Sequence, residues 1–72
     1  MKQEWFNPSN GRRYKVEVYE DLLGDCVLMR RWEGCYKPGN QKMAVLSNYD
    51  AAMKEVQTIE AKRRLNGYVR VL

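Results

Sequence analysis

The stretch SNYDAAMKEVQTIEAKRRLNG, residues 47–67, decides the fold of this 72-residue chain. Its apolar side chains recur at helical spacing and form one stripe, made by Tyr49, Ala52, Met53, Val56 and Ile59. Ser47 stands three residues before Asp50, as in a capping box at a helix start. Asn66-Gly67 supplies residue types that tolerate a left-handed helix end. The sequence therefore predicts one amphipathic helix, whose stripe must be buried against a second layer.

Strand patterns on both sides of this helix supply that layer. The segments with strand chemistry are RYKVEVYE (13–20), CVLMRRW (26–32), KMAVL (42–46) and GYVRVL (67–72). The turns between the first three are too short for crossover connections, so the strands should pair antiparallel. We predict an α+β fold, a small antiparallel β-sheet with one amphipathic helix packed on one face, forming a single domain over residues 1–72.

Composition narrows the function classes. The chain has no histidine, and no nucleophile motif surrounds Ser9, Ser47 or Cys35, so we expect neither an enzyme nor catalytic residues. Two cysteines without histidine fall short of the four ligands of a structural zinc site, so we expect no metal and no cofactor. The chain shows no apolar run long enough for a membrane span or a signal peptide, which predicts a cytoplasmic protein without a membrane partner.

The basic balance of the chain is compatible with a polyanionic partner. Thirteen Lys and Arg oppose nine Asp and Glu, which gives a net charge of +4. Cations that neutralise phosphates release condensed counterions, and this release drives much of nucleic-acid binding. The densest basic run, residues 62–64, lies in the last turn of the predicted helix, where the helix dipole already accounts for cations.

The stretch RRWEGCYKPGN, residues 30–40, combines an aromatic ring with basic residues at a strand end. Residues 26–29 are typical of a core strand, and the chain leaves that core at the two arginines. Alternation along the strand places Arg30 on the same side as Trp32 and Arg31 on the opposite side. Trp32 is either a plate on which a base stacks or an aromatic that seals the sheet edge, and both interpretations stay open at this point.

From about Arg12 to Tyr68 the succession of elements resembles the WGR domain, a module of poly(ADP-ribose) polymerases and of many small bacterial proteins. The matching features are Tyr14, the DLLG turn at 21–24, Arg31-Trp32, Gly39 and Gly67-Tyr68. In the polymerases this module helps to hold a DNA end, with its tryptophan near the terminal nucleotide. The resemblance implies that role for Trp32.

The signature itself departs from the family pattern. Where the family has Trp-Gly-Arg, this chain has Trp32-Glu33-Gly34, so the motif arginine is absent. Glu33 also places a negative charge beside Trp32, which weakens phosphate binding unless Arg31 or Lys37 offsets it.

Two functions follow from these observations. The first is a non-catalytic WGR-like module that binds nucleic acid weakly, at a DNA end or a single strand, mainly through the phosphate backbone. Its predicted contacts are Trp32, Arg30, Arg31, Lys37, Lys42, Arg12 and Arg13. The alternative is a protein–protein interaction or self-association module without nucleic-acid binding, in which Trp32, Cys35 and Tyr36 form an exposed apolar patch. The oligomeric state and the importance of a 5′-phosphate are left open by the sequence.

Overall fold

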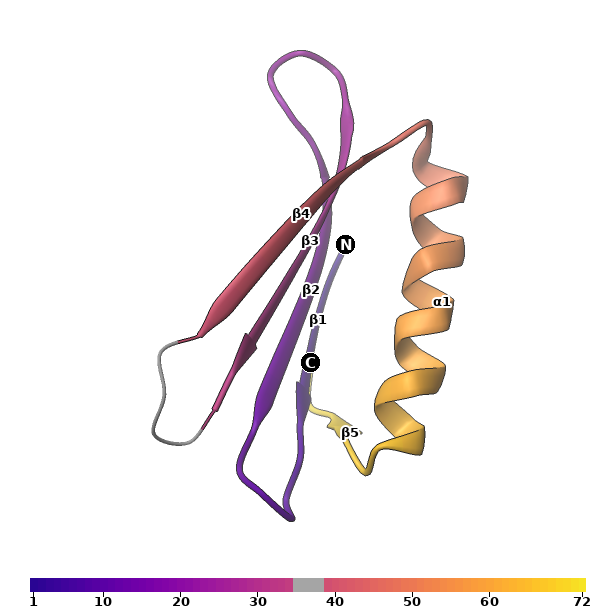
Figure 1. Ribbon diagram of the computed structural model, residues 1–72. Helices are drawn as coiled ribbons and strands as arrows, with labels where there is room; N and C mark the ends of the chain where they lie inside the picture. Colours follow the sequence, from indigo (N-terminus) through magenta and orange to yellow (C-terminus); the bar gives the residue numbers. More distant parts are fainter. Residues whose placement is uncertain (35–38) are drawn as a thin grey trace.

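A computed structural model describes residues 1–34 and 39–72 of the chain. Its elements, in chain order, are β1 (Lys2–Phe6), β2 (Arg13–Glu20), β3 (Cys26–Glu33), β4 (Asn40–Leu46), α1 (Tyr49–Leu65) and β5 (Val69–Arg70). The five strands form one antiparallel sheet in the order β4-β3-β2-β1-β5, and α1 lies across one face of that sheet (Figure 1). This arrangement confirms the predicted α+β fold.

The core lies between α1 and the sheet. The alternating strand β2 directs Tyr14, Val16 and Val18 toward the helix, where all three are buried. From α1, the buried residues are Ala52, Val56 and Ile59, with Met53 partly buried against the same cluster. Tyr49 does not belong to this stripe, because it is 54% exposed in the first helical turn.

Strand β1 is the element that the sequence patterns did not predict. It pairs with β2 along its whole length, from Lys2 opposite Glu17 to Phe6 opposite Arg13. Its inward residue Trp5 is only 1% exposed and is the largest fully buried side chain of the core. Two buried polar residues flank it, and their hydrogen bonds hold β1 against the end of α1. Gln3 donates to Glu60, and the Asn7 amide donates to the Asn66 carbonyl.

The two ends of α1 are capped by side-chain and backbone hydrogen bonds. At the start, the Asn48 side chain accepts a hydrogen bond from the Ala51 N–H at 2.8 Å, so Asn48 and not Ser47 is the N-cap. At the end, the Tyr68 N–H bonds to the Arg63 carbonyl and the Gly67 N–H to the Arg64 carbonyl, the two bonds of a Schellman motif. This turn places Tyr68 beside Arg63.

Gly67 makes that turn possible, because its φ of +86° lies in the left-handed region. Replacing Gly67 with alanine is expected to lower the free energy of unfolding by about 1 kcal/mol, through the strain of a Cβ at positive φ. Urea unfolding measures this loss. A Gly67→Asn variant should lose less, since asparagine tolerates this conformation better. Equal stability of the alanine variant and the parent chain would contradict the assignment.

Candidate functional site

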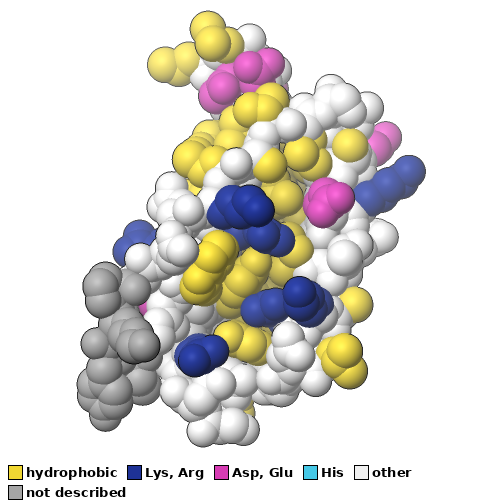
Figure 2. All heavy atoms as spheres, viewed as in Figure 1, with side chains coloured by type: hydrophobic (Ala, Val, Ile, Leu, Met, Phe, Trp, Pro, Cys, Tyr) yellow, Lys and Arg dark blue, Asp and Glu magenta, His cyan; other side chains and the backbone are white. Residues whose placement is uncertain are grey.

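A cleft of about 640 Å³ lies between the C-terminal half of α1 and the ends of β2 and β3. Its lining residues are Arg12, Tyr14, Arg30, Trp32, Glu33, Gly34, Asn40, Glu55, Thr58, Ile59, Lys62, Arg63 and Tyr68. Figure 2 shows Lys and Arg side chains gathered around an apolar strip on this side of the molecule. The cleft therefore combines the aromatic residues and the cations that the sequence places far apart.

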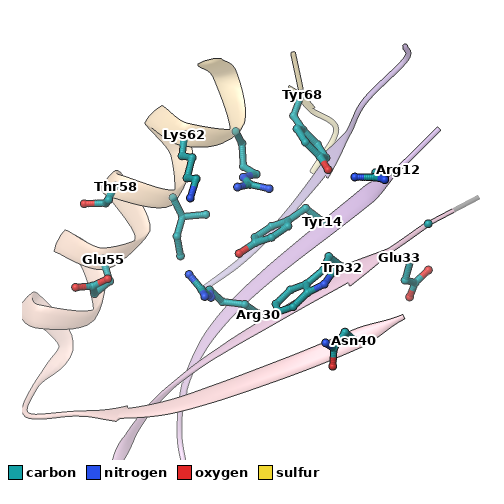
Figure 3. Close-up of a pocket in the computed structure, with 13 residues that line it drawn as sticks. Arg12, Tyr14, Arg30, Trp32, Glu33, Asn40, Glu55, Thr58, Lys62 and Tyr68 are labelled. Carbon is teal, nitrogen blue, oxygen red and sulfur yellow. The ribbon is translucent and has the colours of Figure 1, made fainter. Parts of the chain in front are cut away.

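Aromatic rings form the floor of the cleft. The Trp32 ring lies 6.0 Å from the Tyr14 ring, centroid to centroid, with an angle of 11° between their planes. Tyr68 meets Tyr14 edge-on at 6.4 Å. Because Trp32 and Tyr14 lie directly opposite each other on β3 and β2, sheet register sets this stacking (Figure 3). Trp32 is half-buried, so it both packs on the core and borders the cleft.

Arg63 occupies the centre of this aromatic group. Its guanidinium carbon lies 4.3 Å from the Tyr14 ring centroid and 5.1 Å from that of Tyr68. The Nε atom of Arg63 is buried and has no hydrogen-bond partner among the described residues. Cation–π contacts stabilise such a charge by about 0.5–2 kcal/mol, whereas a buried unsatisfied donor costs about 1–3 kcal/mol. Arg63 as a residue still lines the cleft, so its charge faces the cleft from the α1 side.

Sequence reasoning missed Arg63, because the helix dipole was a sufficient reason for a basic last turn. The pattern did contain one usable signal, which is the spacing of Arg63 from the Asn66-Gly67 helix end. A Schellman motif brings the residue after the glycine back to the position of Arg63, so Tyr68 and Arg63 were predictable neighbours.

Among the residues that the structure describes, three further cations line the cleft, namely Arg12, Arg30 and Lys62. Figure 3 shows Arg30 and Lys62 pointing into the space between the sheet and α1, from opposite walls. Arg30 lies on the Trp32 side of β3, as alternation predicts. Lys42 lies directly opposite Arg30 in the β3–β4 register, and both residues border a smaller adjoining pocket. The structure thus brings Arg12, Arg30 and Lys42 to the Trp32 face.

Two other predicted contacts lie on the opposite face of the sheet, which we call the open face because α1 does not cover it. Arg13 sits over the Phe6 ring there, with its guanidinium carbon 5.6 Å from the ring centroid. Arg31 pairs with Glu33, with its Nε 3.0 Å from the carboxylate. Strand alternation is the reason, since neighbouring residues point to opposite faces. Lys37 lies outside the described residues.

The ion pair with Arg31 offsets the negative charge that the sequence places beside Trp32. Glu33 stands at the rim of the cleft, and Figure 3 shows its carboxylate turned away from the Trp32 and Tyr14 rings. Glu55 is the other carboxylate of the lining, against the four cations Arg12, Arg30, Lys62 and Arg63. Within the described part of the chain none of these four forms an ion pair, so the cleft has an uncompensated positive charge.

Arg64, the residue after Arg63, contacts the core side of the fold and not the cleft. It pairs with Glu60 at 3.6 Å and lies over the Trp5 ring, with its guanidinium carbon 5.2 Å from the centroid. Glu60 also accepts the hydrogen bond from Gln3. Arg64 therefore belongs to the contacts that hold β1 on α1. Adjacent residues of a helix point in different directions around its axis, so Arg64 faces β1 whereas Arg63 faces the cleft.

One of three comparisons with known proteins identifies a family. The sequence profile of the WGR domain family matches residues 2–72, a longer span than the 12–68 over which the motifs are evident. Neither curated proteins nor solved structures yield a match to the chain. Among the residues that the structure describes, no helix is both long and apolar enough to cross a bilayer.

Proposed function

The chain belongs to the WGR domain family, and on that premise we propose that it is a non-catalytic module that binds nucleic acid in the cleft around Trp32. The WGR domain is a binding module and not a catalytic domain, and in poly(ADP-ribose) polymerase-like proteins it binds nucleic acid. We propose that residues 1–72 form one such module. A cytoplasmic location remains a prediction from the sequence.

The observation that carries this proposal is the Trp32–Tyr14 stack, with Trp32 half-buried, beside the Arg63 guanidinium, which forms no ion pair among the described residues. A base or a sugar of a terminal or single-stranded nucleotide packs on the accessible part of Trp32. Arg63 and Arg30 donate charge-assisted hydrogen bonds to phosphate oxygens, and Arg12, Lys42 and Lys62 add charge. The loss of the motif arginine at Gly34 leaves this cation set intact, because its members come from other positions on the strands and the helix.

Such a site favours the phosphate backbone over any particular base. The cations of the cleft attract phosphate through charge, so affinity should depend little on base sequence and strongly on salt. Each neutralised phosphate contributes about 0.7 to the slope of log K against log salt for single strands and about 0.9 for duplexes.

Two adjacent arginines of β3 test the proposal with a matched pair of variants. Arg30→Gln removes a cation from the cleft, whereas Arg31→Gln removes one from the open face and releases Glu33. We expect Arg30→Gln to weaken binding of a fluorescent single-stranded oligonucleotide about 3- to 10-fold and to lower the salt slope by about one, as measured by anisotropy. Arg31→Gln should have the smaller effect.

The comparison should use a 5′-phosphorylated duplex and a single strand in parallel, so that the preferred nucleic acid is identified in the same series. An unrelated basic protein of similar charge sets the level of non-specific binding. Binding no tighter than that level, or equal losses in the two arginine variants, would contradict a site in the cleft.

The alternative function is a protein-interaction module, in which Trp32 would contact a partner chain. Cys35 and Tyr36, the other members of that predicted patch, lie outside the described residues. Light scattering separates the two functions, since a dimer that dissociates in Trp32→Ala without any loss of nucleic-acid binding would favour the alternative. The cation set around Trp32 favours nucleic acid, because an apolar protein interface depletes charge at its core.

A further inference from the structure

Strand β4 is an exposed edge of the sheet. It is the outermost strand next to β3, and Figure 1 shows it at one side of the sheet. Its sequence MAVL at 43–46 is apolar at four consecutive positions, as in strands that are covered on both faces. Yet Met43 is 52% and Val45 66% exposed, and only the last residue of the strand, Leu46, is half-buried. The strand thus has the composition of an interior strand in an edge position.

An apolar patch continues from β4 across the open face. Val45 lies opposite Val27, which lies opposite Tyr19, and Met43 lies opposite Met29. Residues in register share a face of the sheet, so these five side chains form one surface, which we call the β4 patch. Val27 is buried within it, although α1 packs on the other face. Continuous apolar surface of this kind commonly marks an interface.

The edge of β4 carries little protection against strand pairing. Natural edge strands carry proline, inward-pointing charges or bulges that prevent association with another strand. The seven residues of β4 contain no proline, and Lys42, on the cleft face, is their single inward-pointing charge, so the open face of β4 carries no charge. No strand pairs with the outer edge of β4 in the described part of the chain, so this edge and the β4 patch present one continuous surface to a partner.

We propose that this surface binds a second copy of the chain, with the two β4 strands antiparallel and Ala44 opposite Ala44 of the second copy. In this register Met43 of each copy faces Val45 of the other, so the two β4 patches join into one apolar surface. Lys42 faces Leu46 and never another lysine. A parallel, in-register pairing would instead align the two lysines, which disfavours it. The edge is thus complementary to itself in one orientation.

A two-fold axis perpendicular to the sheet relates the two copies in this arrangement. Both α1 helices, and with them both clefts, then lie on the same side of a continuous ten-stranded sheet. A nucleic acid long enough to reach both clefts would bind with higher avidity than a short one. This consequence rests on the proposed function, whereas the dimer itself does not.

Sedimentation or light scattering of the full chain, without nucleic acid, tests the dimer over a concentration series that reaches the millimolar range. The mass should rise from one chain toward two. Val45→Lys should raise the dissociation constant about tenfold or more, because it places a charge at an apolar contact. Val69→Lys is the matched control, because Val69 is 51% exposed on β5 at the other edge of the sheet. It should leave the dimer unchanged.

A compensating pair of substitutions tests the register. Met43→Lys and Val45→Glu should each weaken the dimer, and the double variant should recover it, because the register places each lysine opposite a glutamate of the other copy. A chain that stays monomeric at every concentration would overturn the proposal and leave β4 as an edge for a strand of another protein. A dimer broken by Val69→Lys, or a double variant weaker than both single variants, would also overturn it.

Discussion

Replacement of Trp32 with alanine is expected to weaken binding of a single-stranded oligonucleotide by about 5- to 150-fold, because base–aromatic stacking contributes about 1–3 kcal/mol per base. Fluorescence anisotropy at low and moderate salt measures the loss. The salt slope should stay nearly constant, since the substitution removes no cation. A loss of affinity without a change in slope would therefore separate a stacking contact from an electrostatic one.

Trp32 also packs on Tyr14 and on the core, so the variant needs controls for folding. Phe6→Ala removes a half-buried aromatic from the open face and should leave affinity unchanged. Trp32→Tyr keeps an aromatic ring and should retain most of the binding. Equal losses in Phe6→Ala and Trp32→Ala, in variants with parent-like circular dichroism, would show that Trp32 contributes only to the fold.

Replacement of Arg63 with methionine is expected to lower affinity by about 10- to 100-fold, since hydrogen bonds to charged groups contribute about 1.5–3 kcal/mol. The salt slope should fall by about one. Stability should change by less than about 1 kcal/mol, because loss of the cation–π contacts is offset by removal of a buried unsatisfied Nε–H. Anisotropy and urea unfolding measure the two quantities on the same protein.

Arg64→Met is the matched control, since Arg64 is the next residue of the same helical turn and lies outside the cleft. Its loss removes the ion pair with Glu60 and the contact with Trp5, so stability should fall slightly and affinity should hold. The opposite pattern, with Arg64→Met weakening binding as much as Arg63→Met, would mean that the cations act only through net charge.

The fold was largely predictable because its periodic segments are unambiguous. Tyr14, Val16 and Val18 alternate strictly along β2, and Ala52, Val56 and Ile59 repeat at helical spacing along α1. Each pattern allows only one face to be buried, so the two-layer arrangement follows. The prediction placed the N-cap one residue early, because Ser47 and Asn48 both have suitable side chains and only the backbone conformation selects between them.

Strand β1 escaped prediction because its buried face is partly polar. Gln3, Trp5 and Asn7 all point inward, but two of these three residues are polar. The inward positions therefore do not form the apolar pattern by which a strand is recognised. The hydrogen bonds that make these residues suitable for burial come from Glu60 and Asn66, more than fifty residues along the chain. Local patterns contain no information about such distant partners.

The candidate site was predictable only where strand geometry alone decides the outcome. Alternation assigned Arg30 to the Trp32 face and Arg31 to the other, and the register confirms both positions. The position of Arg13 on the open face also follows from alternation, once Tyr14 is known to point inward. Arg63 comes from α1 and not from a strand. Its contacts with Tyr14 and Tyr68 depend on how α1 packs on the sheet, which strand alternation does not determine.

A proton–nitrogen NMR titration with a single-stranded oligonucleotide tests most directly whether Trp32 contacts the ligand. The chain provides its own control, because it has two indole N–H groups. That of Trp5 is buried and donates to Gln3 at 3.2 Å, whereas Trp32 borders the cleft. The indole signal of Trp32 should shift progressively with added oligonucleotide, together with the Arg63 side chain, while that of Trp5 stays in place. Shifts confined to open-face residues such as Arg13 and Arg31, with the Trp32 indole unmoved at saturation, would contradict the account.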